Sequence, residues 1–193
     1  MTALKLSNSD LQNYIFKVIV VGEGGVGKTS LCMRVTRDIF SADYKLTLGT
    51  AFFSYQTALE EMNANIAIQI WDLGGQSKFG SILRSFTQNA KGTILAFDIS
   101  CMDSFIAIQD RWKIFLKNNL PTTPIILIST KNDLSNEHKE VSDELVQNFI
   151  EAEHKSGGLD IVAYIQTSSK LAINAHECFK ELARHIILRN ETE

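Results

Sequence analysis

Short apolar runs alternate with longer stretches of helical periodicity along most of the chain. The runs rich in β-branched residues predict six strands, at 15–21, 51–59, 66–71, 93–98, 125–129 and 161–166. The longer stretches predict helices near 28–38, 79–89, 104–118, 142–154 and 173–189. Within the last stretch, Phe179, Leu182 and Ile186 fall on one apolar stripe, as expected for a helix that lies on a sheet.

One connection departs from this alternation. Only residues 60–65 separate the strands at 51–59 and 66–71, which is too short for a parallel crossover and predicts an antiparallel hairpin. The remaining strands are joined through helices and predict βαβ units. We therefore expect an α/β fold whose six-stranded sheet is mixed but mostly parallel, with about five helices on its two faces. Ligands of such sheets bind beyond the carboxyl ends of the strands.

Length and composition indicate a single globular domain. The chain has 193 residues, of which 45% are hydrophobic and 21% charged. We assign residues 15–190 to the domain, 1–14 to an N-terminal extension and 191–193 to a short tail. The net charge of −3, without any block of Lys and Arg, argues against nucleic acid as a main partner. No apolar run is long enough to span a membrane, and the three scattered cysteines suit a reducing cytoplasm.

The most specific motif is a phosphate-binding loop. Gly22-Glu23-Gly24-Gly25-Val26-Gly27-Lys28-Thr29 satisfies G-x-x-x-x-G-K-[ST] and lies between a predicted strand and a predicted helix, as this motif requires. Glycines allow successive N–H groups to point at phosphate, and the start of the helix adds positive potential. The Lys28 ammonium would contact the outer phosphates, and the Thr29 hydroxyl can ligate Mg²⁺. The loop alone indicates only a nucleoside triphosphate.

Three further motifs follow predicted strands at the same edge of the sheet. Asp72, in Trp71-Asp72-Leu73-Gly74-Gly75-Gln76, stands where a carboxylate near the metal is expected. Thr130-Lys131-Asn132-Asp133 and Thr167-Ser168-Ser169-Lys170 each end another strand. With these motifs the chain resembles the Ras superfamily of small GTPases, and most closely its Rab-like branch, from about Lys17 to the last helix.

This resemblance implies a P-loop NTPase that binds GTP and GDP with Mg²⁺, hydrolyses GTP slowly and changes its effector-binding surface with the nucleotide. It also implies an exchange factor, a GTPase-activating protein and effector proteins as partners, and a role in membrane traffic or signalling. The implied nucleotide contacts are Glu23, Gly24, Gly25, Val26, Gly27, Lys28, Thr29, Ser30, Phe40, Tyr44, Thr47, Gly75, Thr130, Lys131, Asp133, Ser168, Ser169 and Lys170.

Specific roles follow from the same resemblance. Asp133 would accept hydrogen bonds from N1–H and the 2-amino group of guanine, with Lys131 along the base and Ser169 and Lys170 on its O6 side. Phe40 would lie beside the guanine and Tyr44 over the phosphates. Thr130 replaces the more frequent Asn, as it does in Rho-type members.

The resemblance also assigns the metal site and the catalytic residues. Thr29 and Thr47 would ligate Mg²⁺, and Asp72 would contact it through water. Gln76 would orient the attacking water while Lys28 stabilises developing charge, and loss of the γ-phosphate would free Thr47 and the Gly75 region.

Three aromatic residues support the Rab-like branch. Phe52, Trp71 and Phe86 stand at the positions of the exposed effector-binding triad of Rab proteins. The alternative is that they are core residues, as aromatic residues in sheets usually are. Phe53 is expected on the opposite face of its strand and is the better candidate for the core.

Several positions depart from the family pattern. Leu73-Gly74 replaces the Thr-Ala usual in Ras and Rab proteins, and Leu46 replaces a common Pro. No prenylation signal is present at the C-terminus, and Cys178 falls within a predicted helix. We expect a cytoplasmic protein, whose association with membranes, if any, does not use a lipid anchor of its own. Three explanations stay open: the protein works without a lipid, the chain has been truncated, or a partner brings it to membranes.

Two alternatives from other classes remain open at this point. One is a guanine-nucleotide scaffold that does not hydrolyse GTP. The other is a P-loop kinase, although Asp133 and Lys170 would then lack a purpose and the sequence shows no lid for an acceptor substrate.

Overall fold

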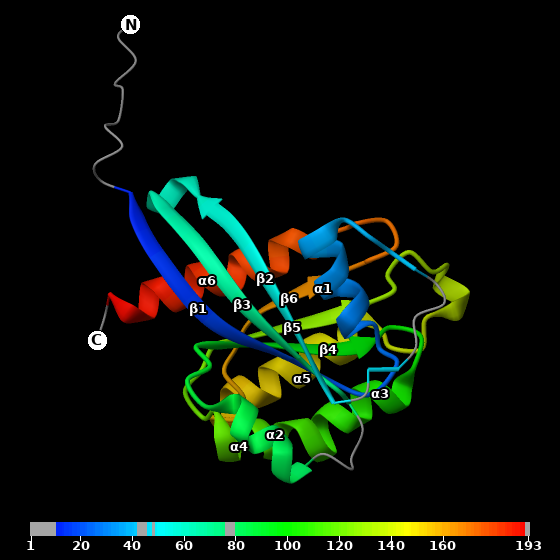
Figure 1. The fold of residues 1–193 in the computed structure, drawn as a ribbon. Helices are drawn as coiled ribbons and strands as arrows, with labels where there is room; N and C mark the ends of the chain where they lie inside the picture. The colour runs from blue at the N-terminus through cyan, green and yellow to red at the C-terminus, as the bar shows by residue number, and fades with distance from the viewer. Residues whose placement is uncertain (1–10, 42–45, 48, 76–79, 192–193) are drawn as a thin grey trace, which may run out of the picture.

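A six-stranded sheet with helices on both faces forms the protein (Figure 1). The computed structural model describes residues 11–41, 46–47, 49–75 and 80–191, without the side chains of 80–83. The strands are β1 (Gln12–Val21), β2 (Thr50–Leu59), β3 (Ala64–Leu73), β4 (Gly92–Asp98), β5 (Ile125–Thr130) and β6 (Ile161–Gln166). Their order in the sheet is β2-β3-β1-β4-β5-β6.

The helices of the described residues follow the predicted alternation. They are α1 (Lys28–Arg37), α2 (Gly80–Thr87), α3 (Met102–Ala107), α4 (Lys113–Asn119), α5 (Asp143–Ser156) and α6 (Ala175–Asn190). A π-helical segment, η4 (Ile108–Trp112), joins α3 to α4, so the single helix expected at 104–118 is present but contains a wider turn. Short 3₁₀ turns, η2 (Glu60–Met62) and η5 (Asn136–His138), occupy two connections.

The pairing of the strands confirms the predicted mixed sheet. β2 and β3 form an antiparallel hairpin with Thr50 opposite Leu73, and every other pair is parallel. β1 pairs with β3 from Gln12 to Val20 but with β4 only from Val18 to Val21. The first half of β1 therefore projects with β2 and β3 beyond the rest of the sheet (Figure 1).

Two apolar layers hold the helices against the sheet. On one face, Leu31 of α1 and Phe179 of α6 pack with buried strand residues such as Val18 and Ile128. On the other face, Phe105 of α3 and Phe149 of α5 pack with strand residues such as Leu95 and Ile19. The central strand β4 is buried along its whole length, because both of its faces are covered. The loops at the carboxyl ends of the parallel strands are consequently fixed to a rigid base.

Candidate nucleotide-binding site

The loop between β1 and α1 forms the centre of the site. Gly25 and Gly27 adopt left-handed backbone conformations, with φ of 80° and 97°, which glycine tolerates without a steric penalty. Lys28, the first residue of α1, is 5% exposed, and its Nζ donates hydrogen bonds to the carbonyl oxygens of Gly22 (2.8 Å) and Glu23 (2.7 Å). The loop is thus curled around the ammonium group.

Burial makes the charge of Lys28 costly. Desolvation lowers the pKa of Lys28 to about 8, although the nearby carboxylates of Asp72 and Glu23 act in the opposite direction. A phosphate group in the cavity would offset this cost, because it places negative charge next to the ammonium. The cavity at this point is lined by three glycines of the loop and by Thr29, Leu46, Thr47 and Gly75, among others.

Three oxygen-bearing side chains meet beside this cavity. The hydroxyl oxygens of Thr29 and Thr47 lie 2.5 Å apart, and the Thr29 hydroxyl donates to Oδ2 of Asp72. Asp72 is fully buried, and burial raises its pKa, opposed by the Thr29 hydrogen bond and by Lys28. Its Oδ1 has no hydrogen-bond partner among the described residues. A set of oxygen donors with one unpaired buried carboxylate oxygen fits a hard divalent cation such as Mg²⁺.

Two glycines bring the loop after β3 against its neighbours. The amide of Gly74 donates to the carbonyl oxygen of Gly49, 2.8 Å away. A Cβ atom at Gly74 would lie 2.7 Å from that oxygen, and one at Gly75 would lie 2.3 Å from the amide nitrogen of Gly24. Both positions therefore require glycine in this conformation.

A second cavity, of about 390 Å³, continues from the phosphate loop. It shares Gly25, Gly27 and Ser30 with the first cavity, and its other lining residues are Phe40, Ser41, Thr130, Lys131, Asp133, Leu134, Ser169 and Lys170. A cavity of this size suits a small ligand such as a nucleoside. The two predicted base motifs and the phosphate loop, which are distant in sequence, thus line two adjoining cavities.

Asp133 is held in a defined orientation. Its Oδ1 accepts a hydrogen bond from the Ser168 hydroxyl (2.6 Å), and its Oδ2 lies 3.8 Å from Nζ of Lys170. Ser168 is fully buried and Ser169 is nearly so. The Thr130 hydroxyl does not point freely into the cavity, because it donates to the carbonyl oxygens of Val26 (2.6 Å) and Phe97 (3.1 Å). Thr130 therefore links the base motif to the phosphate loop.

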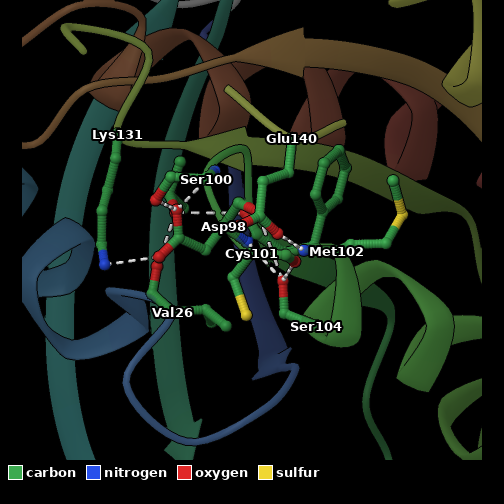
Figure 2. Close-up of polar contacts among 10 residues, drawn as sticks. Val26, Asp98, Ser100, Cys101, Met102, Ser104, Lys131 and Glu140 are labelled. Atoms are coloured by element: carbon green, nitrogen blue, oxygen red, sulfur yellow. Dashed lines mark hydrogen bonds and ion pairs between the residues drawn. The ribbon is translucent and has the colours of Figure 1, made fainter. Parts of the chain in front are cut away.

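Sequence reasoning missed Asp98, the last residue of β4. Figure 2 shows Lys131 extended beside the Val26 segment toward this carboxylate. The Nζ of Lys131 lies 2.5 Å from Oδ2 of Asp98, whose Oδ1 accepts hydrogen bonds from the amide (2.9 Å) and hydroxyl (2.7 Å) of Ser100. The signal was available, because a carboxylate that ends a parallel strand lies at the ligand-binding edge.

Some predicted residues contribute differently or cannot be placed. Tyr44 and Gln76 lie outside the described residues. The Glu23 side chain is bonded to Arg111 and Trp112 of η4. Phe40 lines the second cavity and is 38% exposed.

The three aromatic residues assigned to effector binding form one cluster. The ring centroids of Phe52 and Trp71 are 4.5 Å apart, and those of Trp71 and Phe86 are 5.5 Å apart. Phe52 is 60% exposed, whereas Trp71 and Phe86 are partly buried against the core. Nζ of Lys17 lies 3.7 Å from the centroid of the Trp71 ring. Phe53 packs against the opposite core, as expected from its place in the strand.

Among the described residues, no helix has the length and apolar character needed to cross a bilayer.

The sequence is similar to a known protein family and to individual members of it. The sequence profile of the Ras family matches residues 17–188. The chain is 31% identical to the Ypt/Rab-type GTPase ypt7 of Pyricularia oryzae over 190 residues, covering 96% of this chain and 88% of that protein. It is 33% identical to the Ypt/Rab-type GTPase YPT7 of Saccharomyces cerevisiae over 189 residues, with coverage of 96% and 88%. It is also 32% identical to the human Ras-related protein Rab-30 over 179 residues, with coverage of 91% and 81%.

Proposed function

The chain belongs to the Ras family as a Rab-like small GTPase, and from this premise we propose that it is a molecular switch that binds GTP with Mg²⁺ and slowly hydrolyses it to GDP. The observation that carries the proposal is a pair of adjoining cavities that share three lining residues, one cavity lined by Lys28 and the other by Asp133. The buried ammonium of Lys28 is available to phosphate at one end, and the carboxylate of Asp133 is available to a base at the other.

Asp133 supports guanine over adenine. The N1–H and the 2-amino group of guanine are two adjacent donors, which a carboxylate can accept together, whereas adenine has no such pair. The hydrogen bond from Ser168 and the ammonium of Lys170 orient this carboxylate before the base arrives. In this account Lys131 lies along the base, held in place by Asp98.

Phosphate binding and hydrolysis depend on charge that is already in place. Lys28 and the first amides of α1 stabilise the negative charge that develops on the phosphates. Thr29 and Thr47 would hold Mg²⁺, with Asp72 acting through water, and the bound ion supplies charge that neutralises the outer phosphates. Gln76 positions the water for in-line attack. Gly75, the residue before it, lies against the backbone of the phosphate loop. Intrinsic turnover is slow, and an activating protein accelerates it by about 10³–10⁵-fold.

The cluster Phe52, Trp71 and Phe86 is the proposed docking surface for effectors. Phe52 lies on β2, which begins just after Thr47, and Trp71 directly precedes Asp72 on β3. Changes at the phosphate site therefore reach this surface through short segments of chain. Because the similar proteins are Ypt/Rab-type GTPases, we propose that the switch acts in membrane traffic, with an exchange factor and an activating protein as regulators.

The proposal is tested by denaturing the purified protein and chromatographing the nucleotide it releases. We expect stoichiometric GDP or GTP, and adenine nucleotide would contradict the proposal.

Single-turnover release of γ-phosphate then separates a slow enzyme from a scaffold. GTP that stays intact for hours, even with a cognate activator, would show a scaffold. Activator-stimulated turnover should be strongly reduced in Gln76→Leu, and full turnover in that variant would refute the role of Gln76.

A further inference from the structure

Arg111 connects the phosphate loop to the loop that follows β3. Its Nη1 donates one hydrogen bond to Oε1 of Glu23 (2.7 Å) and another to the carbonyl oxygen of Gly75 (3.1 Å). Glu23 lies in the phosphate loop, and Gly75 ends the described part of the other loop. One guanidinium group thus holds both loops at the same point.

Trp112 fixes the position of this guanidinium group. The carbon of the Arg111 guanidinium lies 4.6 Å from the centroid of the Trp112 ring, a distance at which cation–π attraction is effective. Trp112 is 1% exposed, and its Nε1 donates to the same Oε1 of Glu23 (3.1 Å). Both residues belong to the π-helical segment η4, and such segments within helices often occur at functional sites. Two neighbouring side chains therefore share one carboxylate oxygen.

The two contacts of Arg111 should differ in their dependence on the nucleotide. Glu23 lies two residues after the buried end of β1, so its contact with Arg111 should not require the γ-phosphate. Gly75 lies against the backbone of Glu23 and Gly24, because a Cβ there would be 2.3 Å from each of two loop atoms. Under the proposed function, this region moves away once the γ-phosphate is lost. Only the contact with Gly75 would then be broken.

We infer that Arg111 is a positioning residue that favours the triphosphate conformation by fastening Gly75 to the phosphate loop. A contact made in one of two states shifts the equilibrium toward that state, and only by the free energy of that contact. The inference rests on the proposed function, since it requires a γ-phosphate-dependent change near Gly75. It assigns to η4 a role in selecting between GTP and GDP.

The test compares the affinities of Arg111→Met and the wild type for GDP and for a non-hydrolysable GTP analogue. Methionine keeps an unbranched stem over Trp112 but removes the donors. We expect the affinity for the analogue to fall by about 3- to 10-fold, the range for a partly exposed hydrogen bond from a charged group. The affinity for GDP should stay within about twofold. Lys117→Met, an equal change of charge at an exposed position of α4, should alter neither value.

The outcomes separate this inference from the proposed function. An equal loss of affinity for both nucleotides in Arg111→Met would indicate a merely structural role and overturn the inference. An unchanged affinity for the analogue would overturn it as well. In both cases guanine binding by the wild type would leave the proposed function standing. A wild-type protein that binds no guanine nucleotide would overturn both.

Discussion

Lys28 carries a buried charge at the proposed phosphate site. Its ammonium is buried, and among the described residues it donates hydrogen bonds to two carbonyl oxygens, with the carboxylates of Asp72 and Glu23 farther away. Maintaining a charge there costs free energy in the absence of a ligand, and a bound phosphate would recover that cost. The lowered pKa of Lys28, about 8, reports the same cost.

The pKa of Lys28 predicts how stability changes with pH. In the unfolded chain Lys28 keeps its ordinary pKa of 10.5, so between pH 8 and 10.5 the unfolded state binds a proton that the folded state lacks. The free energy of unfolding therefore rises with pH in this window. From pH 7 to pH 8.5, nucleotide-free wild type should gain about 1 kcal/mol relative to Lys28→Met in urea unfolding.

Comparing the wild type with Lys28→Met cancels the contributions of other titrating groups to the pH dependence of stability. Burial also raises the pKa values of the Cys32 and Cys178 thiols, but both proteins contain these residues, so their effect cancels. A wild-type curve that runs parallel to that of Lys28→Met would mean that Lys28 keeps its ordinary pKa, and the argument from its burial would fail.

Single residues also mark the limit of sequence reasoning. The places of Lys28 and Asp133 at one edge of the sheet could be predicted, because the rule for parallel strands needs only the order of the motifs. The side chains that contact these motifs from elsewhere in the chain could not be predicted. Arg111 reaches Glu23 from a helix nearly ninety positions later in the chain, and no spacing rule connects them. Asp98 is an intermediate case, since its strand was predicted but its ion pair with Lys131 was not.

At the scale of elements, strand and helix types were predictable and their ends were less so. β1 begins at Gln12, three residues before the predicted strand. The prediction missed these residues because they are mostly polar and show no alternating pattern. These residues are nevertheless paired with β3, which also starts earlier than expected. The turn at η4 gave no signal either, since the apolar spacing of Phe105, Ile108 and Trp112 is compatible with an ordinary helix.

The contact between β4 and α6 makes a prediction about stability. A Cβ at Gly92 would lie 2.8 Å from Cδ1 of Leu182 and 3.0 Å from Cδ1 of Ile186. Gly92→Ala should therefore destabilise the protein by about 1–2 kcal/mol in urea unfolding, since overpacking a closed core forces side chains from their rotamers.

A second variant tests whether this clash is the cause. Leu182→Ala alone should cost about 2–5 kcal/mol, because it leaves a cavity in the core. The double variant should be less destabilised than the sum of the two single variants, since the new methyl group occupies part of that cavity. Strict additivity would show that Gly92 and Leu182 do not interact.

At the scale of the whole molecule, the site is assembled from loops that belong to different parts of the chain. Thr29 follows β1, Thr47 precedes β2 and Asp72 lies near the end of β3, yet their oxygen atoms meet. A cation bound there would join these three segments and the phosphates of the nucleotide. Losing it should loosen the nucleotide and the segments around Thr47 and Gly75 together.

Removal of the metal should therefore accelerate release of the nucleotide. With fluorescent GDP bound, chelation of Mg²⁺ by EDTA should raise the dissociation rate by at least about tenfold, since a metal contributes several kcal/mol of charge stabilisation to bound phosphate. Asp72→Asn should respond less to EDTA, because its metal site is already weakened. A dissociation rate that is the same with and without Mg²⁺ would contradict the assignment of Thr29, Thr47 and Asp72.

The most direct test of the account is the selectivity for guanine. Calorimetric titrations with GDP and with ADP, in buffer with Mg²⁺, should show wild-type affinity at least about 100-fold higher for GDP, because two hydrogen bonds to a carboxylate are available to guanine alone. In Asp133→Asn the affinity for GDP should fall by at least about tenfold, since one acceptor is replaced by a donor. Equal affinities of the wild type for GDP and ADP, or an unchanged affinity of Asp133→Asn for GDP, would contradict the account.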